Sequence, residues 1–170
     1  MPSARGDVTA AFAQDVLTRE GAFWVREATS SMLPLIRPGD ELRLAPVGPR
    51  RLVRGMLIAY QREPGLVVHR VVACDETGVV AKGDALAAPD PVVPPAQVVA
   101  RVIALRRANG RLVDLEAFPW PVVNRVLGAI ASFACRLSLG DSLDRVPSPL
   151  RFIVWKAHRL PFHVARLFLR

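Results

Sequence analysis

Lysine and cysteine are scarce in this chain of 170 residues. Only Lys82 and Lys156 among the 23 basic residues are lysines, so the other 21 are arginines. Cys74 and Cys135 lie far apart and form no CxxC pair, which excludes a disulfide scaffold and a cysteine-rich zinc site. Both are most simply explained as buried apolar side chains in a reducing compartment.

Metal-binding and phosphate-binding patterns are also missing. The three histidines, His69, His158 and His163, have no acid or cysteine at a metal-ligand spacing. The sequence contains no glycine-rich loop of the GxxxxGK[ST] or GxGxxG type. We therefore expect neither a metal ion nor another cofactor.

The chain lacks a long hydrophobic run. Its longest apolar stretch, residues 126–135, lies between Arg125 and Arg136, whereas a membrane-spanning helix needs about 20 residues. The first twenty residues carry five charged side chains and no apolar core, so they do not form a secretory signal. These features predict a cytoplasmic protein that could meet the inner membrane only peripherally.

Short β-branched segments fill the middle of the chain, separated by turns that contain glycine or proline. The expected strands are residues 40–45, 56–60, 65–73, 78–81, 97–106 and 111–116. Strands of this length with such turns predict a mostly antiparallel β domain over residues 23–116.

Helical patterns flank this domain. In residues 1–22, Val8, Phe12 and Val16 recur every four positions, and Asp7 can cap a short amphipathic helix over residues 7–20. Residues 117–170 form a basic appendage with helices expected at 121–138 and 149–169. The predicted fold class is therefore α+β, with a β-rich core, a short N-terminal helix and basic C-terminal helices.

The appendage carries much of the positive charge of a chain whose formal net charge is +8. Residues 145–170 contain six basic residues and no acid, interleaved with aromatic and aliphatic side chains. Such a segment suits peripheral contact with a membrane or binding to an acidic partner. It equally suits a helix that docks on the domain with its arginines in water. We expect no nucleic-acid binding, because no helix-turn-helix or aromatic RNP pattern accompanies the basic charge.

Two segments suggest nucleophilic chemistry. Ser31 precedes Pro34, Pro38 and Gly39, which restrict the chain around the hydroxyl. A serine nucleophile requires such a fixed backbone, so that it meets a base and an oxyanion donor together. In the expected strand 65–73, His69 shares a face with its second neighbours on either side, both valines. There an imidazole is partly desolvated and suited to act as a general base.

A third segment, residues 82–90, supplies two carboxylates. Asp84 and Asp90 follow a strand, and either can orient the imidazole or stabilise the loop by accepting backbone hydrogen bonds. Histidine is favoured over lysine as the base, because Lys82 is expected in this loop and Lys156 lies in the basic appendage.

Taken together, Ser-Met-x-Pro at Ser31, Val-His-Arg-Val at His69 and Lys-Gly-Asp at Asp84 resemble the signal peptidase I family of serine endopeptidases. The order and spacing are most similar to the archaeal and endoplasmic-reticulum branch, in which histidine replaces the lysine base. The resemblance runs from about Phe23 to Arg107.

The resemblance implies a role for each matching residue. Ser31 is the expected nucleophile, His69 the general base and Asp90 the third catalytic residue. Asp84 is expected to support the site, and Thr29 stands where the family often has a hydroxyl that helps the oxyanion hole. The implied reaction is cleavage of a leader or signal-like peptide after small residues.

The chain departs from the family because the 22 residues before the expected core contain no segment able to span a membrane. This difference favours a dedicated role, such as trimming one leader, over bulk secretory processing. Two alternatives remain open. One is a catalytically silent binding module of the same fold. The other is a self-cleaving repressor-type peptidase, although the Ala-Gly and Cys-Gly bonds cut by such proteins do not occur here.

Overall fold

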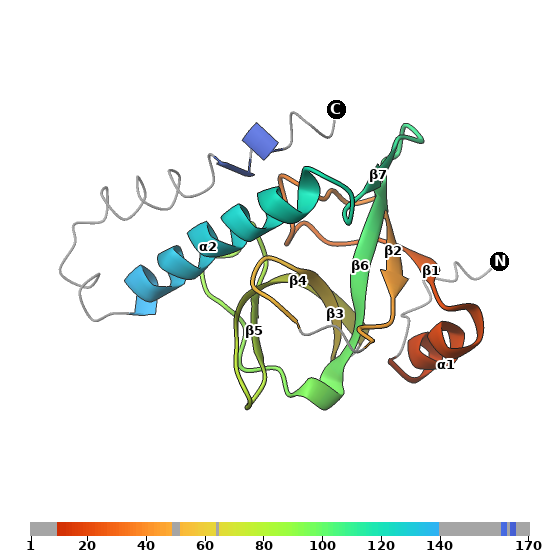
Figure 1. Ribbon diagram of the computed structural model, residues 1–170, viewed down its shortest axis with the longest axis horizontal. Helices are drawn as coiled ribbons and strands as arrows, with labels where there is room; N and C mark the ends of the chain where they lie inside the picture. Colours follow the sequence, from red (N-terminus) through yellow and green to blue (C-terminus); the bar gives the residue numbers. More distant parts are fainter. Residues whose placement is uncertain (1–9, 49–51, 64, 140–160, 163, 166–170) are drawn as a thin grey trace.

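The elements of the protein are arranged around one antiparallel sheet. The computed structural model (Figure 1) describes residues 10–48, 52–63, 65–139, 161–162 and 164–165. In chain order the elements are α1 (Ala10–Glu20), β1 (Phe23–Arg26), β2 (Glu41–Ala45), β3 (Leu57–Arg62), β4 (Gly65–Cys74), β5 (Val79–Lys82), the 3-10 helix η1 (Pro95–Gln97), β6 (Val98–Arg106), β7 (Leu112–Asp114) and α2 (Trp120–Leu139).

The sheet has seven strands in the order β1-β2-β6-β3-β4-β5, and β7 also pairs with β6. Every pairing is antiparallel. This arrangement, with two α-helices on a mostly β core, confirms the predicted α+β class. The six expected strands are present within a few residues of their predicted bounds. Strand β1, a four-residue strand at one edge of the sheet, was not among the expected strands.

Successive side chains of strand β4 point to opposite faces of the sheet. His69 pairs with Ile58 of β3, and Arg70 pairs with Leu57. Because successive side chains in a strand point to opposite faces, His69 and Arg70 face different parts of the core. Val67 and Val71 join the smaller apolar cluster, on the His69 face, as the alternation predicted.

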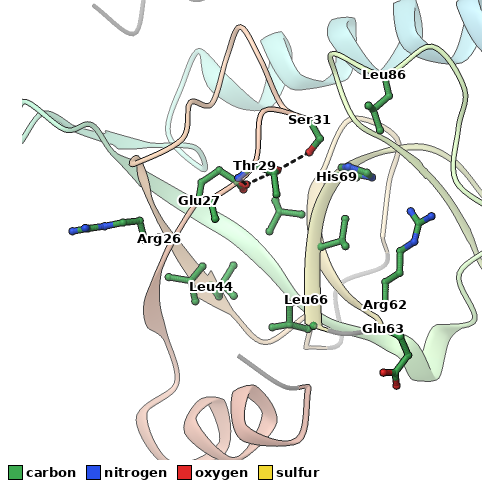
Figure 2. A pocket seen from close by; sticks show the side chains of 15 residues that line it. Arg26, Glu27, Thr29, Ser31, Leu44, Arg62, Glu63, Leu66, His69 and Leu86 are labelled. Atoms are coloured by element: carbon green, nitrogen blue, oxygen red, sulfur yellow. Dashed lines mark hydrogen bonds between the residues drawn. The ribbon is translucent and has the colours of Figure 1, made fainter. Parts of the chain in front are cut away.

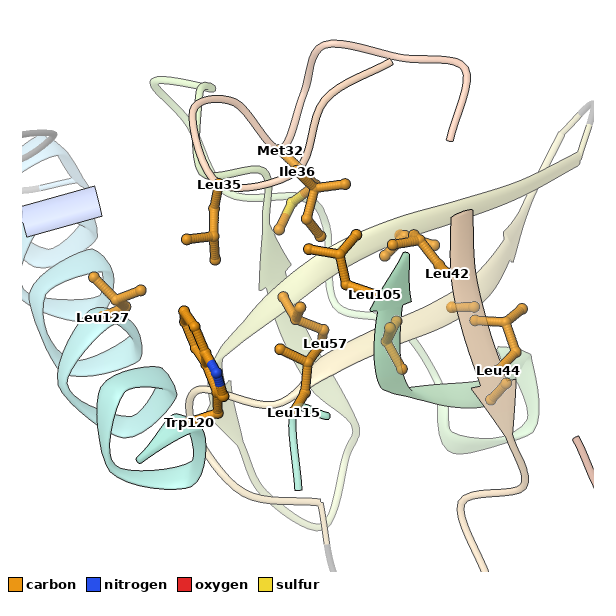
Figure 3. Close-up of a cluster of buried hydrophobic side chains, with 14 of the residues drawn as sticks. Met32, Leu35, Ile36, Leu42, Leu44, Leu57, Leu105, Leu115, Trp120 and Leu127 are labelled. Carbon is orange, nitrogen blue, oxygen red and sulfur yellow. The ribbon is translucent and has the colours of Figure 1, made fainter. Parts of the chain in front are cut away.

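The larger apolar cluster lies between the sheet and α2. Figure 3 shows Trp120 and Leu127 of α2 facing Leu57, with Met32 and Leu35 above them. Met32 is 0% exposed and Leu35 is 1% exposed. The loop that carries Ser31 is therefore held by the same core that holds α2.

Helix α1 buries a different face from the predicted one. Ala10, Ala13 and Leu17 are buried, whereas Phe12 is 57% exposed. Two small alanines let the helix backbone approach the sheet closely, and this contact leaves the bulkier Phe12 side chain in solvent. The expected cap Asp7 lies outside the described residues.

The expected helix over residues 149–169 lies outside the described residues, apart from 161–162 and 164–165. Within these, Phe162 is 1% exposed, and its ring lies 5.7 Å from the Arg70 guanidinium. Phe162 therefore packs against the domain, as Trp120 and Leu127 of α2 also do. Among the described residues, no helix has the length and apolar character needed to cross a membrane.

The two cysteines have different surroundings. Cys135 is buried in the larger cluster, as predicted. The prediction that Cys74 is buried is wrong, because it lies exposed at the end of β4, where its thiol donates a hydrogen bond to the Leu52 carbonyl.

A glycine pair sets the distance between α2 and the turn before β3. A Cβ added at Gly55, whose φ is +98°, would lie 2.3 Å from the Asn124 carbonyl oxygen, and one added at Gly128 would lie 2.5 Å from Gly55 Cα. Gly110 also has a positive φ, of +84°, but a Cβ there would meet no atom within 4 Å.

We expect Gly55→Ala to destabilise the protein more than Gly110→Ala, by about 2 kcal/mol or more, because only the first clashes with the α2 backbone. Both substitutions pay the same backbone strain, so Gly110→Ala is the matched control. Urea unfolding followed by circular dichroism gives the two free energies, and equal losses would contradict close packing of α2.

Candidate active site

Ser31 begins a turn that connects β1 to β2. Arg107 holds this turn by donating hydrogen bonds to the Leu35 carbonyl, at 2.8 Å, and to the Asp40 carboxylate. The backbone N–H of Arg37 also donates to Asp40, at 2.8 Å. The buried apolar side chains and this buried ion pair therefore fix the backbone on which Ser31 sits, while its hydroxyl stays at the surface of a cavity.

The segment that contains Lys-Gly-Asp also contacts the backbone of the Ser31 loop. The backbone N–H of Ala85 donates to the Ser31 carbonyl at 2.8 Å. A Cβ added at Gly83 would lie 2.8 Å from the same carbonyl oxygen, so only glycine permits this approach. Lys82 lies on β5 and is 2% exposed, not in the loop where it was expected.

His69 and Asp90 form a buried pair. His69 is 2% exposed, and its Nδ1 lies 2.5 Å from Asp90 Oδ2. The other oxygen of Asp90 accepts a hydrogen bond from Arg62 at 2.8 Å, and the Tyr60 hydroxyl lies 3.3 Å from His69 Nδ1. A neutral imidazole that donates from Nδ1 to Asp90 keeps Nε2 as a proton acceptor, which is the tautomer required of a general base.

The contacts around this pair shift the pKa values of Asp90 and Tyr60. Burial raises the pKa of Asp90, but hydrogen bonds and charge from His69, Tyr60 and Arg62 outweigh burial and hold that pKa below its usual range. Burial, together with the Asp90 carboxylate, raises the pKa of Tyr60 well above its ordinary value. Asp90 therefore favours its ionised form, which can stabilise a protonated imidazole.

The Ser31 hydroxyl is hydrogen-bonded to Thr29. The Thr29 Oγ1 lies 3.1 Å from Ser31 Oγ and donates to Glu27 Oε1 at 2.7 Å. A threonine hydroxyl has one hydrogen, so Thr29 accepts the hydrogen of Ser31. Among the described residues no hydrogen bond joins Ser31 to His69, although Figure 2 shows both side chains on the same cavity.

Ser31 must therefore turn its hydroxyl from Thr29 toward His69 before it can transfer a proton. Catalytic hydrogen bonds are often long or misaligned without substrate and tighten when it binds. The expected oxyanion role of Thr29 stays a prediction. It requires the Thr29 hydrogen to leave Glu27, since one hydrogen cannot serve two acceptors.

Glu27 was not among the residues expected at the site. Glu27 is 7% exposed. Its Oε1, which accepts the hydrogen bond of the Thr29 hydroxyl, also accepts one from the Thr29 backbone N–H at 2.8 Å. The signal was the spacing of two between Glu27, Thr29 and Ser31, because alternate residues of an extended segment project to one side. Without the strand β1 this alternation was not recognised.

Asp84 does not contact the imidazole. Its two oxygens accept hydrogen bonds from Arg70, at 2.9 and 2.8 Å, on the other side of β4. Arg70 also donates to the Gly55 carbonyl and to Asn124 Oδ1, and both members of the ion pair are at most 1% exposed. Of the two candidate aspartates, the structure brings Asp90 to His69 and gives Asp84 the supporting position.

The cavity beside Ser31 and His69 has a volume of about 490 Å³. Apolar side chains from four parts of the chain form much of its wall, and Figure 2 labels Leu44, Leu66 and Leu86 among them. They are Val25, Leu44, Leu66, Val67, Val68 and Leu86. A cavity of this size admits part of a peptide beside the two catalytic candidates.

Comparison with known proteins does not assign a family or a function to this chain. No protein-family model matches the chain. No curated protein matches its sequence either. A functional hypothesis therefore depends on the geometry of these residues and on the resemblance of their motifs.

We expect Asp84→Asn to lower the free energy of unfolding by about 3 to 5 kcal/mol, because it leaves the Arg70 charge buried and unpaired. The matched control is Asp15→Asn, which removes an exposed 3.0 Å pair with Arg19 and should cost at most about 1 kcal/mol. Urea unfolding measures both values. A small loss for Asp84→Asn would show that the buried pair is not a main support of the site.

Proposed function

We propose that this protein is a serine endopeptidase of the signal-peptidase type. The observation that carries the proposal is the 2.5 Å pairing of His69 Nδ1 with Asp90, with Ser31 on the same cavity. A histidine buried only for packing does not need a carboxylate on one ring nitrogen and a serine-lined cavity beside it. The proposal assigns Ser31 as nucleophile, His69 as general base and Asp90 as the group that orients the imidazole.

The reaction proceeds in two stages. His69 takes the proton of Ser31 as Oγ attacks a peptide carbonyl, and the imidazolium then protonates the leaving amine to give an acyl-enzyme. Water, deprotonated by the same imidazole, attacks the ester, and the proton returns to Ser31. The Ser31 backbone N–H, which donates to no described residue, supports the negative charge on the carbonyl oxygen.

The substrate in this proposal is a leader or signal-like peptide. Cleavage after small residues follows from the family resemblance. Peripheral membrane contact through residues 145–170 is part of the same proposal. The free cysteines, one of them exposed, fit action in a reducing compartment such as the cytoplasm.

We expect Ser31→Ala to lower peptide cleavage by about a thousandfold or more, because the attacking oxygen is lost. Ser30→Ala is the matched control, since Ser30 is an exposed neighbour whose side chain takes no part in the proposed reaction. Cleavage of an alanine-rich peptide, together with labelling by a fluorophosphonate, measures the effect, and circular dichroism checks the fold.

The outcomes separate the candidate functions. Labelling of wild type and Ser30→Ala, but not of Ser31→Ala, supports the peptidase. A Ser31→Ala variant that cleaves as fast as wild type contradicts the assignment. Absence of labelling at Ser31 in the wild type favours the silent binding module, and slow nicking of the purified chain by itself favours the repressor-type alternative.

We expect Asp90→Asn to reduce kcat by about 10² to 10⁴-fold, because an amide neither stabilises the imidazolium nor selects the required tautomer. Asp75→Asn serves as control, since Asp75 caps an exposed turn through Thr77. Steady-state kinetics on the same peptide give kcat. Retention of full kcat in Asp90→Asn would exclude Asp90 from the reaction.

A further inference from the structure

A buried carboxylate without a cation lies on the wall of the cavity. Glu27 is 7% exposed, and no described Lys, Arg or His has a nitrogen within 4 Å of its carboxylate. Its Oε1 accepts two hydrogen bonds from Thr29, whereas Oε2 accepts none from a described residue. Buried carboxylates are normally paired, because an uncompensated charge is costly away from water.

The arginines that line the same cavity have other partners. Arg62 pairs with Asp90 at 2.8 Å. Arg26 is largely exposed and lies 3.6 Å from Glu41. Neither guanidinium is therefore the counter-ion of Glu27, and within the described part of the chain Oε2 is available to a cation that a ligand brings.

The walls of the cavity define the kind of cation. Val25, Leu44 and Leu66 line the same cavity as Glu27 with aliphatic surface. Lysine and arginine side chains place their methylene stems on apolar surface and their charged ends on polar groups. Within the described residues no group of three or more His, Cys, Asp or Glu could hold a metal ion. The surroundings thus match a basic side chain better than an inorganic cation.

Glu27 lies close enough to Ser31 to contact a side chain of a peptide that is bound there. Two hydrogen bonds, of 2.7 and 3.1 Å, connect Glu27 Oε1 to Ser31 Oγ through Thr29. An extended peptide advances about 3.3 Å per residue. When the scissile carbonyl of a bound peptide lies at Ser31, a peptide side chain within a few positions of that bond can therefore reach Glu27.

We propose that Glu27 is a specificity-determining residue that binds a lysine or arginine side chain of the peptide substrate, within a few residues of the cleaved bond. This inference rests on the proposed peptidase function and narrows it to leader peptides with a basic residue near the cleavage site. The carboxylate pairs with the cation through Oε2, and Oε1 keeps its hydrogen bonds to Thr29.

The test uses alanine-rich decapeptides that carry one lysine, or one norleucine in its place, at each of the four positions on either side of a central Ala-Ala bond. Norleucine keeps the methylene stem of lysine and removes the charge. We expect wild type to cleave the best lysine peptide with a kcat/KM about tenfold to hundredfold above its norleucine partner, the range for a charge-assisted hydrogen bond.

Glu27→Gln is the informative variant. Its carbonyl oxygen can still accept both hydrogen bonds from Thr29, so the loop is preserved while the charge is lost. We expect the lysine-to-norleucine ratio to fall to about one in this variant. Glu63→Gln is the control, because Glu63 is an exposed carboxylate on the same cavity, and it should retain the preference.

Binding to the Ser31→Ala protein separates the inference from the proposed function. Fluorescence polarisation of labelled peptides measures affinity without turnover, in Ser31→Ala alone and combined with Glu27→Gln. Preferential binding of the lysine peptide that requires Glu27 supports the inference even when wild type cleaves nothing, in which case the proposed peptidase fails. Equal cleavage and equal binding of lysine and norleucine peptides overturn the inference and leave the peptidase standing. If Glu63→Gln loses the preference for lysine as fully as Glu27→Gln does, the inference is also overturned. The preference then comes from the total negative charge of the cavity and not from a contact with Glu27.

Discussion

The buried guanidinium of Arg70 is the interaction on which the architecture of the site depends. Arg70 is 0% exposed and joins β4 to three other parts of the chain, through Asp84, the Gly55 carbonyl and Asn124 of α2. A charge at this depth is tolerated only when all its donors find partners, so these segments have little freedom to move apart. Because His69 precedes Arg70 in the same strand, fixing Arg70 on one face of the sheet fixes the imidazole on the other.

Three carboxylates around Ser31 differ in role because their surroundings differ. Asp84 is neutralised by Arg70 and connects the Lys-Gly-Asp segment to the core. Asp90 is shared between His69 and Arg62, and these partners hold its pKa below the usual range despite burial. Glu27 has hydrogen-bond donors but no described cation. The same functional group is thus paired with a buried guanidinium in Asp84, shared between an imidazole and a guanidinium in Asp90, and bonded only to neutral donors in Glu27.

Much of this organisation was predictable from local sequence. The six predicted strands and α2 were recognised because β-branched runs bounded by Gly and Pro turns, and a long apolar helical pattern, reflect backbone preferences. Strand β1 was missed because its four residues carry too short a pattern. The buried face of α1 was assigned to Phe12 on hydrophobicity, whereas packing favoured small alanines that allow close approach.

Composition and local order were enough to select the candidate residues. The scarcity of lysine made His69 the candidate base. The alternation of side chains along a strand placed His69 and Arg70 on opposite faces, because backbone geometry sets that alternation. Only the tertiary structure decided which aspartate meets the imidazole. Asp90 reaches His69 because its loop returns to β5, where the Asp90 N–H bonds the Ala81 carbonyl. It also decided that Glu27 holds the hydroxyl hydrogen of Thr29. Such contacts depend on the path of whole loops through space, which the packing of distant segments determines and a local pattern does not encode.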